Sequence, residues 1–216
     1  MDACATASSL VSARFHGLLA MDFSPPIILA SASPRRAELL AQIGVPFQVV
    51  AADIDETPQE GEAAIDYVQR MAKEKVAAVA ALFSDRIVLA ADTSVIVDGE
   101  IWGKPLSRQH AKVMLAGLSD RNHQVMTAVA VHHRDCLEFQ LSVTDVAFAA
   151  LTTAEIGTYV DSGDADDKAG AYGIQGAAGC FVKHLSGSYS GVMGLPLYET
   201  AVLLRKTGMT LEPVNE

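Results

Sequence analysis

Short apolar runs with strand character alternate with amphipathic helical stretches along most of the chain, and this alternation most constrains its fold. The first run, "PIILAS" at 26–31, leads directly into a helix start, with Ser33 as the capping residue and Pro34 at the first helical position. Two long runs, 123–135 and 136–151, indicate neighbouring antiparallel strands. The sequence therefore predicts an α/β protein with a mixed β-sheet.

Periodicity and turn residues predict the remaining elements. Gly44 and Gly117 end helices, Asp98–Gly99 forms a hairpin turn, and Asp92–Thr93 breaks the strand before that hairpin. In chain order we expect a strand at 45–53, a helix at about 62–83, a strand and hairpin within 86–105, helices at 107–120 and 153–163, a glycine-rich loop at 166–179, a strand at 180–187 and a final helix at 195–208. The sequence contains no repeat and no long linker, so residues 24–208 are predicted to form a single domain, with a tail at 209–216.

Residues 1–23 are predicted to be an N-terminal extension, either a disordered tail or the product of an upstream start. The first 20 residues are rich in serine and alanine, and no basic segment precedes "GLLA", so a secretory signal is poorly supported. Met21 is a natural first residue, just before the first strand.

Charge and cysteine content exclude several classes of function. Sixteen Lys and Arg residues stand against 26 Asp and Glu residues, which gives a net charge of −10 and argues against general binding to nucleic acid or to a membrane surface. A site for an anion must therefore concentrate its positive charge locally. The three cysteines, Cys4, Cys136 and Cys180, lie far apart and form no CxxC motif, which fits a reduced, cytoplasmic protein. The apolar runs fall short of the ~20 residues of a membrane span.

The helix start "SASPRRAELL" places Arg35 and Arg36 in the first turn, where the helix dipole disfavours cations by roughly 0.3–1 kcal/mol each. Two guanidinium groups beside free backbone N–H groups make an anion site, and a phosphate there would offset the dipole. Ser31 and Ser33 add hydroxyl groups. The alternative is a pair of solvated surface arginines.

The segment "LAADT" places Asp92 at the predicted end of an apolar strand, where open α/β sheets bind ligands. A carboxylate there can hold a metal ion or take a proton from water, and the alternative is a capping or turn residue. Lys104, just past the hairpin, could return close to Asp92, whereas Lys75 on the long helix is more often a solvated charge.

An acidic loop precedes the long helix. Asp53, Asp55 and Glu56 offer the oxygen ligands that hard divalent cations prefer, although such a loop is usually solvent-facing. His123 and His184 show no partner pattern.

The glycine-rich loop "AGAYGIQG" permits a close approach between backbone and ligand, but it matches neither a Walker A loop nor a dinucleotide fingerprint. Gln175 presents a donor and an acceptor on one planar amide. This pair complements an imide edge such as that of uracil or thymine. The alternative is a mobile connector with a surface glutamine.

Six motifs in order, "ILASASPRRAELL", "DETP", "EK", "LAADTSVIVDGEIWGKP", "DKAGAYGIQG" and "GSYSGVMGLPLYET", resemble the Maf family of nucleoside triphosphate pyrophosphatases. The resemblance extends from Ile27 to about Leu204. It implies an elongated mixed sheet flanked by helices, with two lobes and a deep cleft. It also implies hydrolysis of a nucleotide to its monophosphate and pyrophosphate with a divalent cation, Mg²⁺ or Mn²⁺, and a homodimer.

Carried over by motif, the resemblance assigns a role to each candidate. It implies that Asp92 is the catalytic base, and that Glu56 and Asp92 hold the metal ion. The phosphate-binding residues would be Ser31, Arg35, Arg36, Lys75 and Lys104. The residues that influence substrate choice would be Arg35, Thr93 and Gln175.

At these positions the chain looks like the subgroup that acts on dTTP and UTP, and it lacks the Trp, Gln and Glu markers of the sister subgroup that prefers 7-methyl-GTP. Two alternatives stay open. One is a nucleotide-binding regulator of septum formation and cell division with little hydrolysis. The other is a pyrophosphatase that removes modified or purine nucleotides from the precursor pool.

Overall fold

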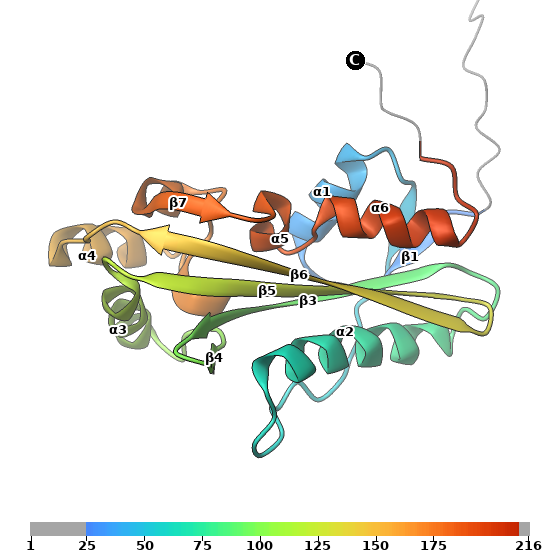
Figure 1. Ribbon diagram of the computed structural model, residues 1–216, viewed down its shortest axis with the longest axis horizontal. Coiled ribbons are helices and arrows are strands. Elements are labelled where there is room, and N and C mark those ends of the chain that lie inside the picture. Colours follow the sequence, from blue (N-terminus) through green and yellow to red (C-terminus); the bar gives the residue numbers. More distant parts are fainter. Residues whose placement is uncertain (1–24, 212–216) are drawn as a thin grey trace, which may run out of the picture.

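The computed structural model of the protein describes residues 25–211 and is built on one seven-stranded mixed sheet (Figure 1). The strands are β1 (Ile27–Leu29), β2 (Phe47–Val49), β3 (Val88–Val97), β4 (Glu100–Trp102), β5 (Asn122–His133), β6 (Cys136–Phe148) and β7 (Val182–Ser186). Their order is β2-β1-β3-β5-β6-β7, and β4 pairs with β3. The β1–β2 and β1–β3 pairs are parallel and the others antiparallel, so the predicted mixed α/β fold is confirmed.

Helices cover both faces of the sheet. They are α1 (Pro34–Gln42), α2 (Ala64–Ala80), α3 (Arg108–Leu118), α4 (Thr153–Asp161), α5 (Tyr189–Met193) and α6 (Leu197–Lys206), with 3₁₀ turns η1 (Ala169–Ala171) and η2 (Ala177–Phe181). In Figure 1, α2 runs along one face of β3 and β5, and α1, α5 and α6 lie on the other face. Among the described residues, no helix combines the length and apolarity needed to cross a membrane.

The alternation of side chains along β3 divides the core between these two faces. Val88 and Ala90 pack with the apolar stripe of α2, whereas Leu89 and Ala91 pack with α1 and α6. A third cluster, built on α3, α4 and Phe148, fills the other end of the sheet. The two ends of the sheet thus form two lobes.

The register of β3 explains where a ligand can enter the sheet. One edge of β3 pairs with β5 from Val88 to Ile96. The other edge pairs with β1 only up to Leu89 and with β4 only from Val95. Between these two partners, the described structure leaves that edge of β3 open, at the point where β1 ends.

Some predicted elements are confirmed and others need correction. The hairpin turn stands at Asp98–Gly99, where both residues have positive φ. The break predicted at Asp92–Thr93 is wrong, because β3 continues through both residues along β5. The strand predicted at 45–53 is shorter in the structure and covers only Phe47–Val49, because its partner β1 is only three residues long.

Two helices also differ from the prediction. Gly117 does not end its helix, which continues to Leu118; a Cβ at Gly117 would lie 2.7 Å from the ring of Trp102, so glycine admits the indole here. The short helix α5 was not predicted. Residues 1–23 and the last five residues of the predicted tail lie outside the described part of the chain.

Candidate active site

A cavity of about 480 Å³ lies against the open edge of β3. Its walls come from the segment after β1, the loop before α2, one face of α2, the middle of β3, the segment after β4, the glycine-rich loop and α5. All of the site residues predicted from the sequence line it: Ser31, Arg35, Arg36, Glu56, Lys75, Asp92, Thr93, Lys104 and Gln175. The structure therefore brings the whole predicted set together, whereas Asp53 and Asp55 stay outside the cavity wall.

Asp92 faces α2, where it meets Lys75. Lys75 Nζ lies 2.7 Å from Asp92 Oδ1 and 2.9 Å from Glu56 Oε1. Each of Lys75 and Asp92 is only 7% exposed, so the alternative of a solvated surface lysine is wrong. The position of Asp92 differs from the prediction as well, because it lies in the middle of β3 and not at a strand end. It is the carboxyl end of β1 that opens the site.

The loop that carries Glu56 is attached to α2 by Tyr67. The Tyr67 hydroxyl donates a hydrogen bond of 2.9 Å to the Glu56 carbonyl oxygen. Burial, with a smaller contribution from Asp92, raises the pKa of Tyr67 to about 12, so this hydroxyl keeps its proton at neutral pH. Tyr67 was not among the site residues predicted from the sequence.

The donor set fits a divalent cation bound together with phosphate. Within residues 25–211, no group of three or more His, Cys, Asp or Glu side chains could enclose a metal ion. Asp92 and Glu56 nevertheless both contact Lys75 Nζ, so their carboxylates lie close together. Mg²⁺ is commonly held by one or two carboxylates, several waters and substrate phosphates, and these two carboxylates suit that mode.

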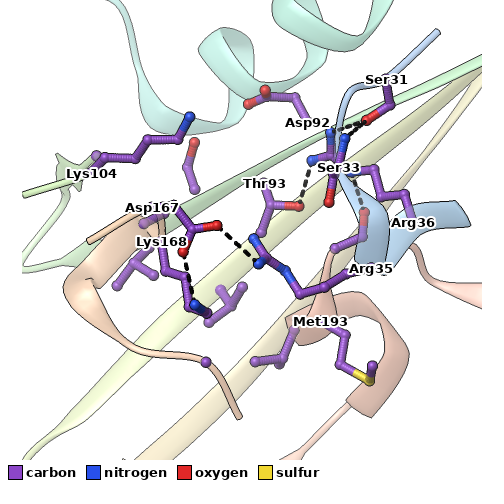
Figure 2. Close-up of a pocket in the computed structure, with 18 of the residues that line it drawn as sticks. Ser31, Ser33, Arg35, Arg36, Asp92, Thr93, Lys104, Asp167, Lys168 and Met193 are labelled. Atoms are coloured by element: carbon purple, nitrogen blue, oxygen red, sulfur yellow. Dashed lines mark hydrogen bonds and ion pairs between the residues drawn. The ribbon is translucent and has the colours of Figure 1, made fainter. Parts of the chain in front are cut away.

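Arg36 is the centre of a network that joins three elements. Its Nε donates to the Gly194 carbonyl oxygen at 2.8 Å, Nη1 to Ser31 Oγ at 3.2 Å and Nη2 to Thr93 Oγ1 at 3.3 Å (Figure 2). Burial lowers the pKa of Arg36, and the nearby charge of Asp92 partly offsets this effect. An arginine keeps its charge under such a shift, so the site retains a fixed cation.

Arg35 turns in a different direction from Arg36. It forms an ion pair of 3.3 Å with Asp167, a residue of the glycine-rich loop, and its side chain is 24% exposed (Figure 2). The Asp167 carboxylate also lies 2.8 Å from Lys168 Nζ. Because a surface ion pair is weak, Arg35 can leave Asp167 for another anion more easily than Arg36 can leave its hydrogen-bond partners.

Lys104 reaches the cavity from the segment that follows β4 (Figure 2). It is exposed, and no described side chain pairs with it. Gln175 is exposed at the cavity wall, in the turn between η1 and η2. These two residues therefore add exposed donor groups to the cavity wall.

Sequence reasoning missed the residues that support the glycine-rich loop. Lys168 Nζ donates to the Asp164 carbonyl oxygen at 2.6 Å, and a Cβ at Gly173 would lie 2.6 Å from Lys168 Cε. The Asp-Lys pair ahead of the glycines was the available signal for this role. Glycine at 173 thus lets the buried lysine stem pass beneath the loop.

His123 was also missed as a partner in this region. It lies 2.8 Å from the Tyr172 hydroxyl and packs edge-on against Tyr172 and Phe148. Burial lowers the pKa of His123 to about 4, so the ring is neutral at pH 7. The pair joins β5 to the glycine-rich loop on the side away from solvent.

Comparison with known proteins places the chain in a family. Relatives described as dTTP/UTP pyrophosphatases include one from Methylobacillus flagellatus, 54% identical over 187 residues, which are 86% of this chain and 94% of the relative. Another, from Methylococcus capsulatus, is 52% identical and covers 85% of this chain and 91% of the relative. Among solved structures, the Staphylococcus aureus Ham1 protein aligns with 57% of this chain and 71% of its own, at 19% identity and a TM-score of 0.42.

Residues 26–207 match the family described as Maf-like protein, a span that contains every residue of the cavity wall. With this match, and with relatives more than 50% identical over most of both chains, the chain belongs to the Maf family.

Proposed function

We propose that this protein hydrolyses dTTP and UTP to the nucleoside monophosphate and pyrophosphate. The observation that carries the proposal is the buried contact of Asp92 with Lys75, at the open edge of β3 and within the same cavity as two arginines and Gln175. A carboxylate for proton abstraction, cations for a triphosphate and an amide for a base edge are thus available to one bound nucleotide. The names of the relatives support the same activity.

The groups that we assign to the triphosphate are Ser31, Arg35, Arg36 and Lys104. Ser31 Oγ accepts hydrogen bonds from Arg36 and from the Ser33 N–H, both at 3.2 Å, so its own proton points elsewhere. A hydroxyl with both acceptor positions used is a donor toward a phosphate oxygen. Arg35 would exchange Asp167 for phosphate, a stronger and bidentate partner.

Asp92 is assigned as the base that activates water. Lys75 occupies Oδ1, and Oδ2 has no protein partner among the described residues, so Oδ2 is the oxygen that can accept a proton. Lys75 keeps the carboxylate oriented between α2 and β3. We also assign Lys75 to the phosphates, as its motif implies; in this arrangement it would contact them while it stays between Asp92 and Glu56.

Asp92 and Glu56 would hold Mg²⁺ or Mn²⁺, which when bound neutralises phosphate charge and polarises the phosphoryl group under attack. A homodimer and a cytoplasmic location also belong to this proposal, as does a catalytic domain that spans residues 24–208.

Gln175 is assigned to the base. Its amide can donate to a carbonyl and accept from a ring N–H, the pattern of uracil and thymine. A substituent at C5 leaves that edge unchanged, so C5-modified uracil nucleotides are expected substrates too.

The test is a nucleotide panel on the purified full chain with Mg²⁺ or Mn²⁺, in which pyrophosphate is measured separately from phosphate. We expect pyrophosphate from dTTP and UTP, and loss of turnover in Asp92→Ala or with a chelator. Release of orthophosphate alone would contradict the reaction, and turnover restricted to purine nucleotides would contradict the substrate class. Tight dTTP binding without turnover would favour a nucleotide-binding regulator.

A further inference from the structure

Two residues of α2 hold Glu56, one by its side chain and one by its backbone. Lys75 Nζ lies 2.9 Å from Glu56 Oε1, and the Tyr67 hydroxyl donates a hydrogen bond of 2.9 Å to the Glu56 carbonyl oxygen. Tyr67, Met71 and Lys75 recur every four residues on the buried stripe of α2, so they share one side of the helix. This side of α2 therefore contacts Glu56 at two separate points.

The segment that carries Glu56 has little structure of its own. Residues 50–63 connect β2 to α2 without a helix or a strand, and Glu56 is exposed. A second residue of α2 holds the next peptide, since Arg70 Nη2 donates to the Thr57 carbonyl oxygen at 3.2 Å. Arg70 is itself held by Glu62 at 2.6 Å, and its Cζ lies 5.6 Å from the centre of the Tyr67 ring. The place of Glu56 thus depends on side chains of α2.

The two contacts of Glu56 differ in what a cation would do to them. A cation held by Asp92 and Glu56 competes with Lys75, because the ammonium group contacts an oxygen of each carboxylate. The Tyr67 hydrogen bond uses the backbone carbonyl of Glu56 and takes up neither carboxylate oxygen. It can therefore persist when the carboxylate turns from Lys75 to a cation.

We propose that Tyr67 is a positioning residue for the divalent cation, because it holds the Glu56 peptide against α2 and so keeps the Glu56 carboxylate beside Asp92. The inference rests on the proposed function, in which these two carboxylates hold Mg²⁺ or Mn²⁺. Tyr67 is 8% exposed, and its ring is fixed within the helix contact. Without the hydroxyl, an exposed segment would have to be ordered each time a cation binds, which weakens binding.

Tyr67→Phe removes the hydroxyl and keeps the buried ring. Because Glu56 is exposed, water can replace the lost donor at its carbonyl, so the fold should survive. We expect the dissociation constant of Mn²⁺ from the full chain, without nucleotide, to rise about three- to tenfold, the effect of one lost hydrogen bond. The EPR signal of free Mn²⁺ measures it directly. The Mn²⁺ concentration that gives half-maximal turnover of UTP should rise by a similar factor.

The matched control is Tyr159→Phe. The Tyr159 hydroxyl also supports a loop of the site, since it accepts from the Gly173 N–H at 3.1 Å and donates to Asp164 Oδ2 at 3.1 Å. These partners belong to the glycine-rich region and not to the segment that carries Glu56. Tyr159→Phe should therefore bind Mn²⁺ as the wild type does.

Glu56→Gln tests whether Tyr67 acts through Glu56. It should itself weaken Mn²⁺ binding, and in its background Tyr67→Phe should have little further effect, because the two residues act as one unit. Additive effects, unchanged affinity in Tyr67→Phe, or equal weakening in Tyr159→Phe would overturn the inference. Unchanged affinity in Glu56→Gln would overturn it together with the metal assignment.

If Tyr67→Phe does not fold, Tyr67→Met serves the same comparison. A wild type whose Mn²⁺ binding depends on Tyr67, but which releases no pyrophosphate from dTTP or UTP, would instead contradict the proposed function.

Discussion

Lys75 Nζ lies 2.7 Å from Asp92 Oδ1 in the contact between α2 and β3, and both side chains are buried. The contact depends on alternation along β3, which turns Asp92 toward α2 and its neighbour Thr93 toward α5. Two adjacent residues of β3 therefore place their side chains on opposite faces of the sheet. The open edge of β3 gives a ligand access to both.

Replacement of Asp92 by asparagine should separate binding from chemistry. The amide oxygen can still accept from Lys75, so the contact between α2 and β3 is kept, but the side chain can no longer take a proton. We expect kcat with UTP to fall about 10²- to 10⁴-fold, the usual contribution of a positioned base. The dissociation constant for UTP, measured by calorimetry, should change little. Normal turnover would mean that another group is the base.

Replacement of Lys75 by methionine should make the folded protein depend on a divalent cation. Without the ammonium group, Asp92 and Glu56 lose the partner that contacts both carboxylates, and breaking a buried ion pair costs about 3–5 kcal/mol. Mn²⁺ bound between the two carboxylates would recover part of that free energy. The melting temperature of Lys75→Met should therefore rise with Mn²⁺ by more than that of wild type.

Lys73→Met is the matched control for this experiment. Lys73 lies on the same helix, with its Nζ over the ring of Phe139 at 3.6 Å. Its replacement should lower stability slightly, without any dependence on Mn²⁺. Equal Mn²⁺ shifts in Lys75→Met and wild type would contradict the assignment of Asp92 and Glu56 to the metal ion.

Substitution of Arg36 should mainly lower stability, whereas substitution of Arg35 should mainly raise KM. Arg36→Ala removes the donor of the Gly194 carbonyl and one hydrogen bond each from Ser31 and Thr93, so the free energy of unfolding should fall by about 2–4 kcal/mol. Arg35→Ala removes only a partly exposed ion pair, worth about 0–1 kcal/mol, but should raise KM for UTP at least tenfold. Urea unfolding together with steady-state kinetics distinguishes the two. A large loss of stability in Arg35→Ala would contradict the division of roles.

Local sequence was sufficient to predict the alternation of strands and helices and the Asp98–Gly99 hairpin, and together with the family resemblance it predicted nine of the residues that line the cavity. It misplaced Asp92 because a polar dipeptide within an apolar run is typical of a strand end. Here it marks the point where the neighbouring strand β1 ends while β3 continues. That distinction depends on strand register, which one sequence does not contain.

The burial of Lys75 left a signal that periodicity could have detected. It lies four residues from Met71 and from Val79, on the buried stripe of α2, so a solvated lysine was inconsistent with the helix pattern. The hydrogen bonds among Arg36, Thr93 and Thr127 left no such signal. They join α1, β3, β5 and α5 across long sequence separations: Thr127 Oγ1 of β5 lies 3.0 Å from Thr93 Oγ1 and 2.7 Å from the Gly191 carbonyl oxygen of α5.

His123 should make the free energy of unfolding decrease at acidic pH, and substitution of His123 should remove this contribution. Burial lowers the pKa of His123 to about 4, whereas the unfolded chain has the ordinary value of about 6.5. Between these two pH values the unfolded state binds a proton that the folded state does not, so the free energy of unfolding falls as the pH falls. This group contributes its full stabilisation above pH 6.5, and between pH 7 and pH 5 the loss amounts to about 2 kcal/mol.

His123→Gln keeps a polar partner for the Tyr172 hydroxyl but cannot titrate. Urea unfolding at pH 7 and pH 5 should therefore show a smaller acid-induced loss in His123→Gln than in wild type, by about 2 kcal/mol. His184→Gln on β7 is the control, because His184 is exposed and its variant should follow the wild type at both pH values. Carboxylates titrate alike in all three proteins, so the difference isolates His123. Identical pH dependence in His123→Gln and wild type would show that the ring accepts its proton as readily in the folded state as in the unfolded chain, and the neutral contact with Tyr172 would then be wrong.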